Sequence, residues 1–234
     1  MTRPVKKNKE RHYLEEAAKR LGLPWVIGLD RECPDFIVTE GTHQFGIEVS
    51  EIFMGATGAN GSQMKRAESG VQRKLNTLRA EFEAAANIPL TVKFVGNMSE
   101  PNTTFVRDRL LAEDFASKPI AYRTVIDTHN GLRVHVTKAL RPDWYSVNDR
   151  VGWVDRNPLP QIIDAVSKKS GELARYIEAA GPDVRLLLFA DCIYNSGKLR
   201  LEEPFEIDLC GFSRVYFFSY PETVTVFGDI AAAA

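Results

Sequence analysis

The sequence predicts an α/β protein in which a mixed central sheet carries flanking helices on both faces. Apolar residues recur at helical spacing in residues 62–86 and 158–179. Short β-rich segments alternate with these helices along the chain. One of these segments, residues 184–191, is almost wholly apolar, which is typical of a strand that is covered on both faces.

The bulk composition is typical of a globular protein with one sizeable core. The chain has 234 residues, of which 44% are hydrophobic and 26% are charged. We find no repeat, low-complexity tract or convincing linker, so we expect a single domain over residues 1–234. The formal net charge of −1 excludes a global basic field, so any polyanion site must arise from local clustering.

The first half of the chain predicts a leading helix, a hairpin and a long helix. The leading helix covers residues 9–21 and ends at Gly22 and Pro24. The elements expected after it are a strand at 25–29, hairpin strands at 35–39 and 44–53, a glycine-rich loop at 54–61, a helix at 62–86, a strand at 90–96 and a helix from Pro101 to about residue 116.

The second half predicts a further hairpin, a helix and three strands. Asn130-Gly131 is a strong signal for a type I′ turn between two β-rich segments. The expected elements are strands at 122–129 and 132–138, an irregular segment at 139–157, a helix at 158–179, and strands at 184–191, 213–220 and 223–228.

Cysteine usage and hydropathy indicate a cytoplasmic protein. Cys33, Cys192 and Cys210 are widely spaced and form no CxxC pair, so a zinc knuckle is not expected. An odd cysteine count without an apolar leader suits a reducing compartment. No stretch approaches the roughly 18 apolar residues that a membrane-spanning helix requires, so we expect no membrane partner.

The stretch PDFIVTEGTHQFGIEVS, residues 34–50, carries the strongest functional signal. Asp35 and Glu48 would lie near one end of neighbouring strands if residues 40–43 form the turn. Glu48 shares a strand face with Gly46 and Ser50, whose small size leaves room for a ligand. Two such carboxylates suit Mg²⁺ or Mn²⁺, although two acids on a solvated hairpin face would have the same spacing.

This layout resembles the PD-(D/E)XK nuclease superfamily over residues 9–96. Pro34-Asp35 is similar to the PD element, and Glu48-Val49-Ser50 is similar to (D/E)XK with serine in place of lysine. The resemblance implies a restriction-endonuclease-like core in residues 9–96, with residues 97–234 as an elaboration. It also implies metal-dependent cleavage of phosphodiester bonds in DNA or RNA, although some members have lost activity.

The superfamily lysine orients water and stabilises charge, which the uncharged Ser50 cannot do. Some members supply this lysine from a following helix, and two lysines here lie on or beside an apolar stripe. Lys74 flanks the stripe of residues 62–86, and Lys169 lies within the stripe of residues 158–179. A snorkelling Lys74 and a structural ion pair of Lys169 are the alternatives.

Glu10 is the acid of the leading helix that the resemblance implies as a metal ligand or as a residue that positions the lysine. It lies on the inner stripe of that helix. The alternative is an exposed glutamate in the first helical turn, where the helix dipole favours it.

Residues 141–156 interleave arginine with aromatic residues, which predicts contacts with nucleic acid. Arg141 and Arg150 would hold phosphates while Trp144 and Trp153 stack on bases. The alternative is a lid that packs on the core through both tryptophans. The basic residues of the N-terminus form a second candidate set for phosphate contacts, namely Arg3, Lys6, Lys7, Lys9 and Arg11.

The sequence thus favours a Mg²⁺-dependent nuclease in which Asp35 and Glu48 bind metal and Lys74 or Lys169 acts on water or charge. Two alternatives stay open. The first is an inactive nuclease-fold module that binds nucleic acid or protein, and the second is an unrelated α/β protein. A homodimer is compatible with cleavage of both strands.

Overall fold

A computed structural model describes residues 4–55, 57–58, 61–147, 154–203 and 205–228. The chain forms two compact units where the sequence suggested a single domain. The first unit combines residues 1–64 with 153–234, and the second unit consists of residues 65–152. Helix α2 (Gln63–Ala86) runs across the boundary, so no change of composition marks it.

The first unit is built on a mixed sheet of the order β1-β2-β3-β10-β11-β12. Strand β10 pairs in parallel with β3 and β11, and the remaining pairs are antiparallel. The strands are β1 (Trp25–Ile27), β2 (Phe36–Glu40), β3 (His43–Glu51), β10 (Val184–Asp191), β11 (Arg214–Tyr220) and β12 (Thr223–Phe227).

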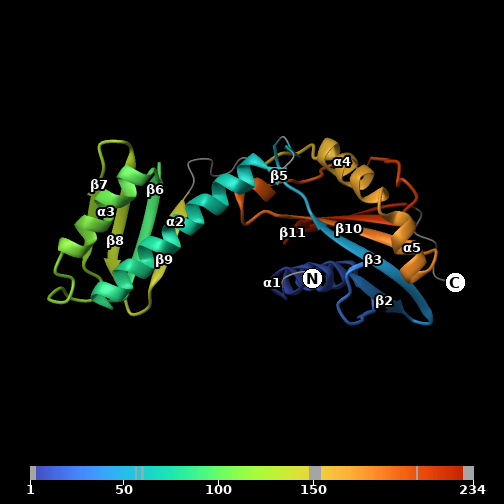
Figure 1. Cartoon of the computed structure of the whole chain (residues 1–234), viewed down its shortest axis with the longest axis horizontal. Helices are drawn as coiled ribbons and strands as arrows, with labels where there is room; N and C mark the ends of the chain where they lie inside the picture. The colour runs from blue at the N-terminus through green and yellow to red at the C-terminus, as the bar shows by residue number, and fades with distance from the viewer. Residues whose placement is uncertain (1–3, 56, 59–60, 148–153, 204, 229–234) are drawn as a thin grey trace. The chain divides into compact units, whose positions relative to one another are not determined.

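Helices cover both faces of this sheet, which confirms the predicted α/β class (Figure 1). Helix α1 (Pro4–Leu21) packs Tyr13 and Leu14 on one face. Helices α4 (Leu159–Ser170) and α5 (Leu173–Ala180) pack on the other face. Every residue of β10 is buried, as its apolar run predicts.

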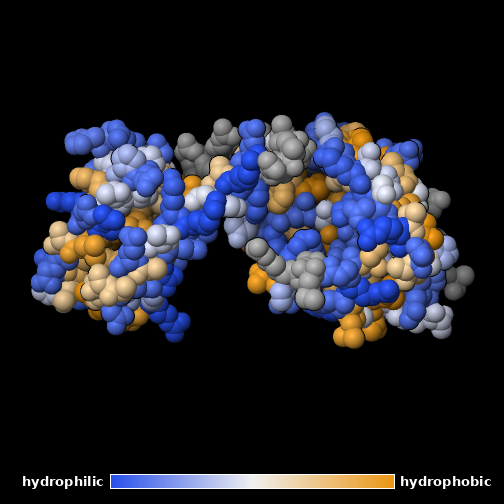
Figure 2. Space-filling view, in the orientation of Figure 1, coloured by the Kyte–Doolittle hydropathy of each residue, from blue (hydrophilic) through white to orange (hydrophobic). Residues whose placement is uncertain are grey.

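The second unit has its own sheet, of the order β7-β8-β6-β9, and its own core. Helices α2 and α3 (Glu100–Ala112) pack on a single face of this sheet (Figure 1). Figure 2 shows that the outward side of α2 is hydrophilic. The strands are β6 (Leu90–Gly96), β7 (Arg123–Asp127), β8 (Leu132–Lys138) and β9 (Asp143–Val147).

Several elements differ from those predicted. Strand β9 lies in the segment expected to be irregular, because its partner β6 is remote in sequence and pairs with it in parallel. The helix expected at 158–179 is interrupted at Gly171, a residue that disfavours a continuous helix. Part of the expected loop at 54–61 forms a minimal ladder between β4 (Thr57–Gly58) and β5 (Gly61–Ser62). A short 3-10 helix, η1, covers Asn195–Gly197.

None of the helices in the described residues has both the length and the apolar character that crossing a membrane demands.

Candidate active site

The β2–β3 register brings Asp35 and Glu48 together. Phe36 pairs with Ile47 in an antiparallel ladder, so Asp35, which precedes Phe36, lies opposite Glu48, which follows Ile47. The Asp35 amide donates a hydrogen bond to Glu48 Oε2 at 3.2 Å, and the Val49 amide donates to Asp35 Oδ2 at 2.9 Å. Both acids are 6% exposed, so they do not lie on a solvated hairpin face.

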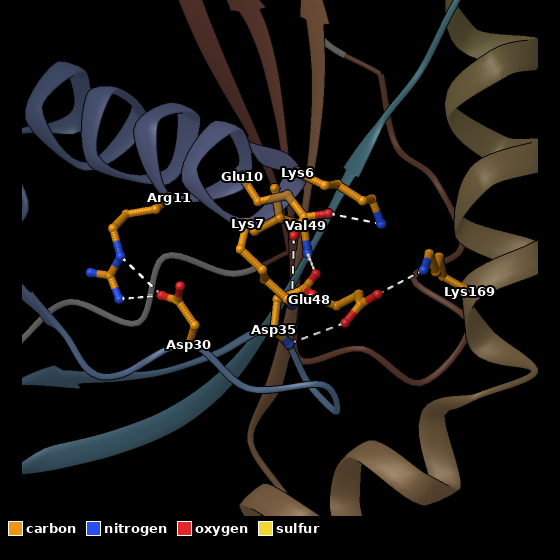
Figure 3. Close-up of polar contacts among 9 residues, drawn as sticks. All are labelled: Lys6, Lys7, Glu10, Arg11, Asp30, Asp35, Glu48, Val49 and Lys169. Carbon is orange, nitrogen blue, oxygen red and sulfur yellow. Dashed lines mark hydrogen bonds and ion pairs between the residues drawn. The ribbon is translucent and has the colours of Figure 1, made fainter. Parts of the chain in front are cut away.

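Lys169 approaches this pair from helix α4. Its Nζ donates a hydrogen bond to Glu48 Oε1 at 2.7 Å (Figure 3). Lys169 and Glu48 are thus in contact although 121 residues separate them in the sequence. The inward position that the apolar stripe predicted for Lys169 is confirmed.

Helix α1 contributes Glu10 and Lys7 from the opposite side (Figure 3). Lys7 Nζ bonds to Asp35 Oδ1 and lies 3.5 Å from Glu10 Oε2. Lys6 Nζ lies 3.0 Å from Glu10 Oε1. Glu10 is 3% exposed, so it is not an exposed first-turn residue. We call Lys7, Glu10, Asp35, Glu48 and Lys169 the carboxylate cluster.

The charges of the carboxylate cluster perturb one another. Burial and the neighbouring charge of Asp35 raise the pKa of Glu48 to about 7, although Lys169 opposes this shift. Burial disfavours the Lys169 ammonium, but the charge and hydrogen bond of Glu48 outweigh burial and raise the pKa of Lys169. The pKa of Lys7 is raised in the same way, because Asp35 and Glu10 outweigh its burial. Strongly shifted groups in a cluster are typical of functional sites.

Two buried polar atoms of the site lack a regular hydrogen bond among the described residues and make weaker contacts with the cluster. Glu10 Oε2 has an ion pair with Lys7 Nζ at 3.5 Å. The hydroxyl of Tyr176, a residue of α5 that is 1% exposed, interacts with the Glu48 carboxylate. Burial raises the pKa of Tyr176, and the charge of Glu48 adds to that effect. Because buried polar atoms usually make full hydrogen bonds, these two atoms keep capacity for a further partner.

Gly46 holds the Pro34 segment against β3. A Cβ added at Gly46 would lie 2.7 Å from Ala180 Cβ and 2.8 Å from Pro34 Cγ. The sequence predicted that Gly46 leaves room for a ligand, and this prediction is wrong because Pro34 and Ala180 fill the space. Glycine at this position lets Pro34 approach the sheet, which sets Asp35 beside Glu48.

A cavity of about 550 Å³ adjoins the cluster within the first unit. Its lining includes Ser50, Glu51, Gln161, Lys168 and Lys169. Lys169 therefore contacts Glu48 and borders the cavity at the same time. Ser50, which occupies the position of the motif lysine, faces this space.

The donor set of the cluster suits a hard divalent cation. Mg²⁺ commonly takes one or two protein carboxylates together with phosphate oxygens of the substrate. Asp35 and Glu48 supply two carboxylates, and Glu10 Oε2 is a buried oxygen whose one contact among the described residues is the 3.5 Å ion pair with Lys7. Across the described ranges, no three His, Cys, Asp or Glu residues gather closely enough to hold a metal by themselves. Binding through protein carboxylates and substrate together is the arrangement that these residues fit.

The other predicted site residues lie elsewhere. Lys74 belongs to the second unit, where its Nζ donates to the Met98 carbonyl at 2.9 Å. Trp144 is 6% exposed and packs near Phe82 and Phe94, so its ring is part of the core and the base-stacking prediction for it is wrong. Arg141 is exposed. Arg150 and Trp153 lie outside the described residues.

The basic N-terminal residues were predicted to contact phosphates, but the described ones form ion pairs within the chain. Lys7 pairs with Asp35, Lys9 with Glu51 and Arg11 with Asp30. Arg3 lies outside the described residues. The predicted helix began at residue 9 and so left Lys7 out. Had it begun earlier, the spacing of three residues between Lys7 and Glu10 would have placed Lys7 on the same inner stripe.

Comparison with known proteins gives no relatives for this chain. No family model, no curated protein and no solved structure matches it. The function must therefore be argued from the carboxylate cluster itself.

Proposed function

We propose that the first unit hydrolyses phosphodiester bonds of nucleic acid with the help of Mg²⁺ or Mn²⁺. The observation that carries this proposal is the buried Glu48, which lies between Asp35 and the Lys169 ammonium beside a cavity. A structural ion pair would not need further buried carboxylates and an adjacent cavity.

The order of the chemical groups also supports the proposal. Glu10 lies on a leading helix, Asp35 follows Pro34, Glu48 lies on the next strand and Lys169 lies on a later helix. This is the arrangement that the PD-(D/E)XK resemblance implies, with the lysine moved from the position of Ser50 to α4. Lys169 thus takes the role for which two lysines were candidates.

Each residue has a distinct role in this proposal. Asp35 and Glu48 would hold the cation, and Glu10 would complete the negative charge around it. A bound cation would polarise the scissile phosphate and lower the pKa of water. Lys169 is a cation at the cavity wall, so it would stabilise the negative charge that develops on the phosphate. The Val49 amide orients Asp35 through its hydrogen bond.

Nuclease assays on the full-length protein test the proposal. Single-stranded and duplex DNA and RNA would be incubated with Mg²⁺ or Mn²⁺, and cleavage rates compared with those in EDTA. We expect metal-dependent cleavage that falls at least about 100-fold in Lys169→Met, the scale on which positioned charge acts in catalysis.

The matched control is Arg175→Met, which removes a cation from the neighbouring helix α5 without touching Glu48 or the cavity. Arg175 pairs with Glu172 at 3.5 Å. We expect this variant to retain most of the activity. Equal loss in both variants would contradict the role of Lys169.

A non-catalytic nucleic-acid-binding protein is the second candidate, and one observation favours it. All four carboxylate oxygens of Asp35 and Glu48 already accept a hydrogen bond or an ion pair. Binding of nucleic acid without cleavage under any of these conditions would establish this second function.

A further inference from the structure

The sheet of the second unit has one covered face and one uncovered face. Along β6, Leu90, Val92 and Phe94 are buried under α2 and α3. The alternate residues Thr91, Lys93 and Val95 are only partly buried, because they lie on the opposite face. The same alternation holds along β8, where each outward residue up to His135 is exposed.

Register places an aromatic residue and basic residues in one row across the uncovered face. Lys93 of β6 pairs with Tyr145 of β9 on one side and with His135 of β8 on the other. His135 in turn pairs with Val125 of β7. Tyr145 is 39% exposed and Val125 is 51% exposed. The neighbouring rows add Arg123 and Arg133. We call these six residues the open face.

The charge of the second unit complements a polyanion. It contains 14 lysines and arginines and 10 acidic residues, which gives a formal charge of +4. The rest of the chain contains 16 basic and 21 acidic residues, a formal charge of −5. Lys93 and Arg123 make no side-chain hydrogen bond or ion pair with any described residue, whereas Arg133 is held by Asp127.

We infer that the open face binds single-stranded nucleic acid, with a base stacked on Tyr145 and the backbone phosphates held by Lys93 and Arg123. Four-stranded sheets with outward aromatic residues bind unpaired bases in this way. A duplex is disfavoured because its bases stack on one another and cannot lie against a flat sheet. The inference deepens the proposed function by giving its substrate class a binding surface apart from the carboxylate cluster.

This surface also explains why the sequence pointed to residues 141–156. The aromatic and basic composition is present, but the strand alternation of β9 turns Trp144 into the core and Tyr145 outward. The exposed ring is therefore the residue after the one that the sequence favoured.

Fluorescence anisotropy with the full chain in EDTA tests the inference without any cleavage. The probes are a labelled single-stranded 20-mer DNA, its RNA equivalent and the matching DNA duplex. We expect tighter binding to the single strands than to the duplex. We also expect Lys93→Glu to weaken binding about tenfold or more, with a shallower salt dependence, and Tyr145→Ala to weaken it about fivefold or more.

Two control variants change the helical layer of the same unit. Arg109→Glu reverses a charge on α3, and Phe105→Ala removes an exposed ring from α3. We expect both to bind like the wild type. Circular dichroism spectra and melting temperatures would show that all four variants fold.

Several outcomes would overturn the inference. They are equal effects of open-face and control variants, preference for the duplex, and absence of binding to every probe. A dimer that Tyr145→Ala or Val125→Arg dissociates, with no nucleic-acid binding, would assign the open face to a second copy of the chain. Because binding is measured in EDTA, cleavage without open-face binding would refute this inference alone, whereas binding without cleavage would refute the proposed function alone.

Discussion

Two charge clusters lie at different places along β3 and β10 of the first unit, and they shift the pKa of a central carboxylate in opposite directions. In the first, Arg185 pairs with Asp183 at 3.0 Å and with Glu40 at 3.6 Å. Its guanidinium lies 3.5 Å from the centre of the Phe45 ring. Asp183 is further bound by Ser213 and His43. We call this group the arginine cluster.

The carboxylate cluster has the opposite character. Burial raises the pKa of Glu48 to about 7, whereas the bonds from Arg185, Ser213 and His43 overcome burial and lower the pKa of Asp183. Within the part of the chain that the structure describes, Glu10 Oε2 of the carboxylate cluster has only the 3.5 Å ion pair with Lys7. Burial of charge alone therefore does not mark a site. A carboxylate whose pKa stays raised, beside a cavity, distinguishes the carboxylate cluster from the arginine cluster.

The largest expected effect comes from removing one cation from each cluster. Arg185→Met leaves Asp183 without its main partner and should lower the free energy of unfolding by about 3–5 kcal/mol. Lys169→Met should cost no more than about 1 kcal/mol at neutral pH, because Glu48 already takes up a proton near pH 7. Urea unfolding in EDTA, followed by circular dichroism, measures both. Equal costs would contradict the distinction between the clusters.

Gly46 connects the two clusters, so its substitution tests whether they are placed independently. Its amide donates to the Asp183 carbonyl at 3.0 Å, and its α-carbon faces Pro34. Gly46→Ala should cost about 1–3 kcal/mol of unfolding free energy, because the added methyl overlaps Pro34 and Ala180. It should also weaken cation binding by displacing Asp35.

Gly70→Ala provides the matched control for that substitution. Gly70 lies within α2, and beyond the backbone of its own helix and its chain neighbours no atom lies within 4 Å of an added Cβ. This change should stabilise the protein by up to about 1 kcal/mol through helix propensity. The same urea experiment measures it, and a gain for Gly46→Ala would contradict the close approach of Pro34.

The two clusters should respond to pH in opposite directions. Because the pKa of Asp183 is lowered in the folded state, its ionised form stabilises the protein at pH values above the ordinary pKa of an aspartate. This stability is lost as the pH falls through the folded-state pKa. The raised pKa of Glu48 contributes stability that is full below pH 4.5 and is lost as the pH rises through about 7.

Unfolding free energies measured from acid to neutral pH in EDTA check these signs. Glu48→Gln should remove the loss between pH 4.5 and about 7, on the order of 3 kcal/mol. Asp183→Asn should flatten only the acid side of the curve. A Glu48→Gln profile parallel to that of the wild type would refute the incomplete compensation of Glu48.

The Lys7 ammonium neutralises part of the negative charge of Asp35 and Glu10, the same charge that a bound divalent cation would neutralise. Lys7→Met removes an ammonium that contacts Asp35 and approaches Glu10. We expect Mn²⁺ affinity to increase about fivefold, measured by isothermal titration calorimetry. Lys6→Met is the control, since Lys6 side-chain exposure is 67% and its charge is largely screened. An unchanged affinity in Lys7→Met would show that Lys7 does not compete for the cluster.

Local sequence patterns predicted the parts of the site that depend on one strand or helix. The hairpin pattern predicted that Asp35 lies near Glu48, and the apolar stripe of its helix predicted that Lys169 points inward. Lys7 was predicted only as a phosphate contact of the N-terminus, because its helix begins earlier than the apolar pattern suggests.

Features that depend on distant segments could not be read from local patterns. The filling of the space beside Gly46 required Ala180 from α5, far along the chain. Strand β9 required pairing with β6, and its short length hid the alternation that buries Trp144. The division into two units required knowledge of which sheet each strand joins.

The central claim is that the carboxylate cluster binds a divalent cation and the arginine cluster does not. The most direct test is the melting temperature of the full chain in EDTA and in rising Mn²⁺, because a ligand that binds the folded state raises it. We predict that Mn²⁺ raises the melting temperature of the wild type and of Asp183→Asn. It should leave the melting temperatures of Asp35→Asn and Glu48→Gln unchanged. An absence of any shift in the wild type, or an equal shift in all four proteins, would contradict the claim.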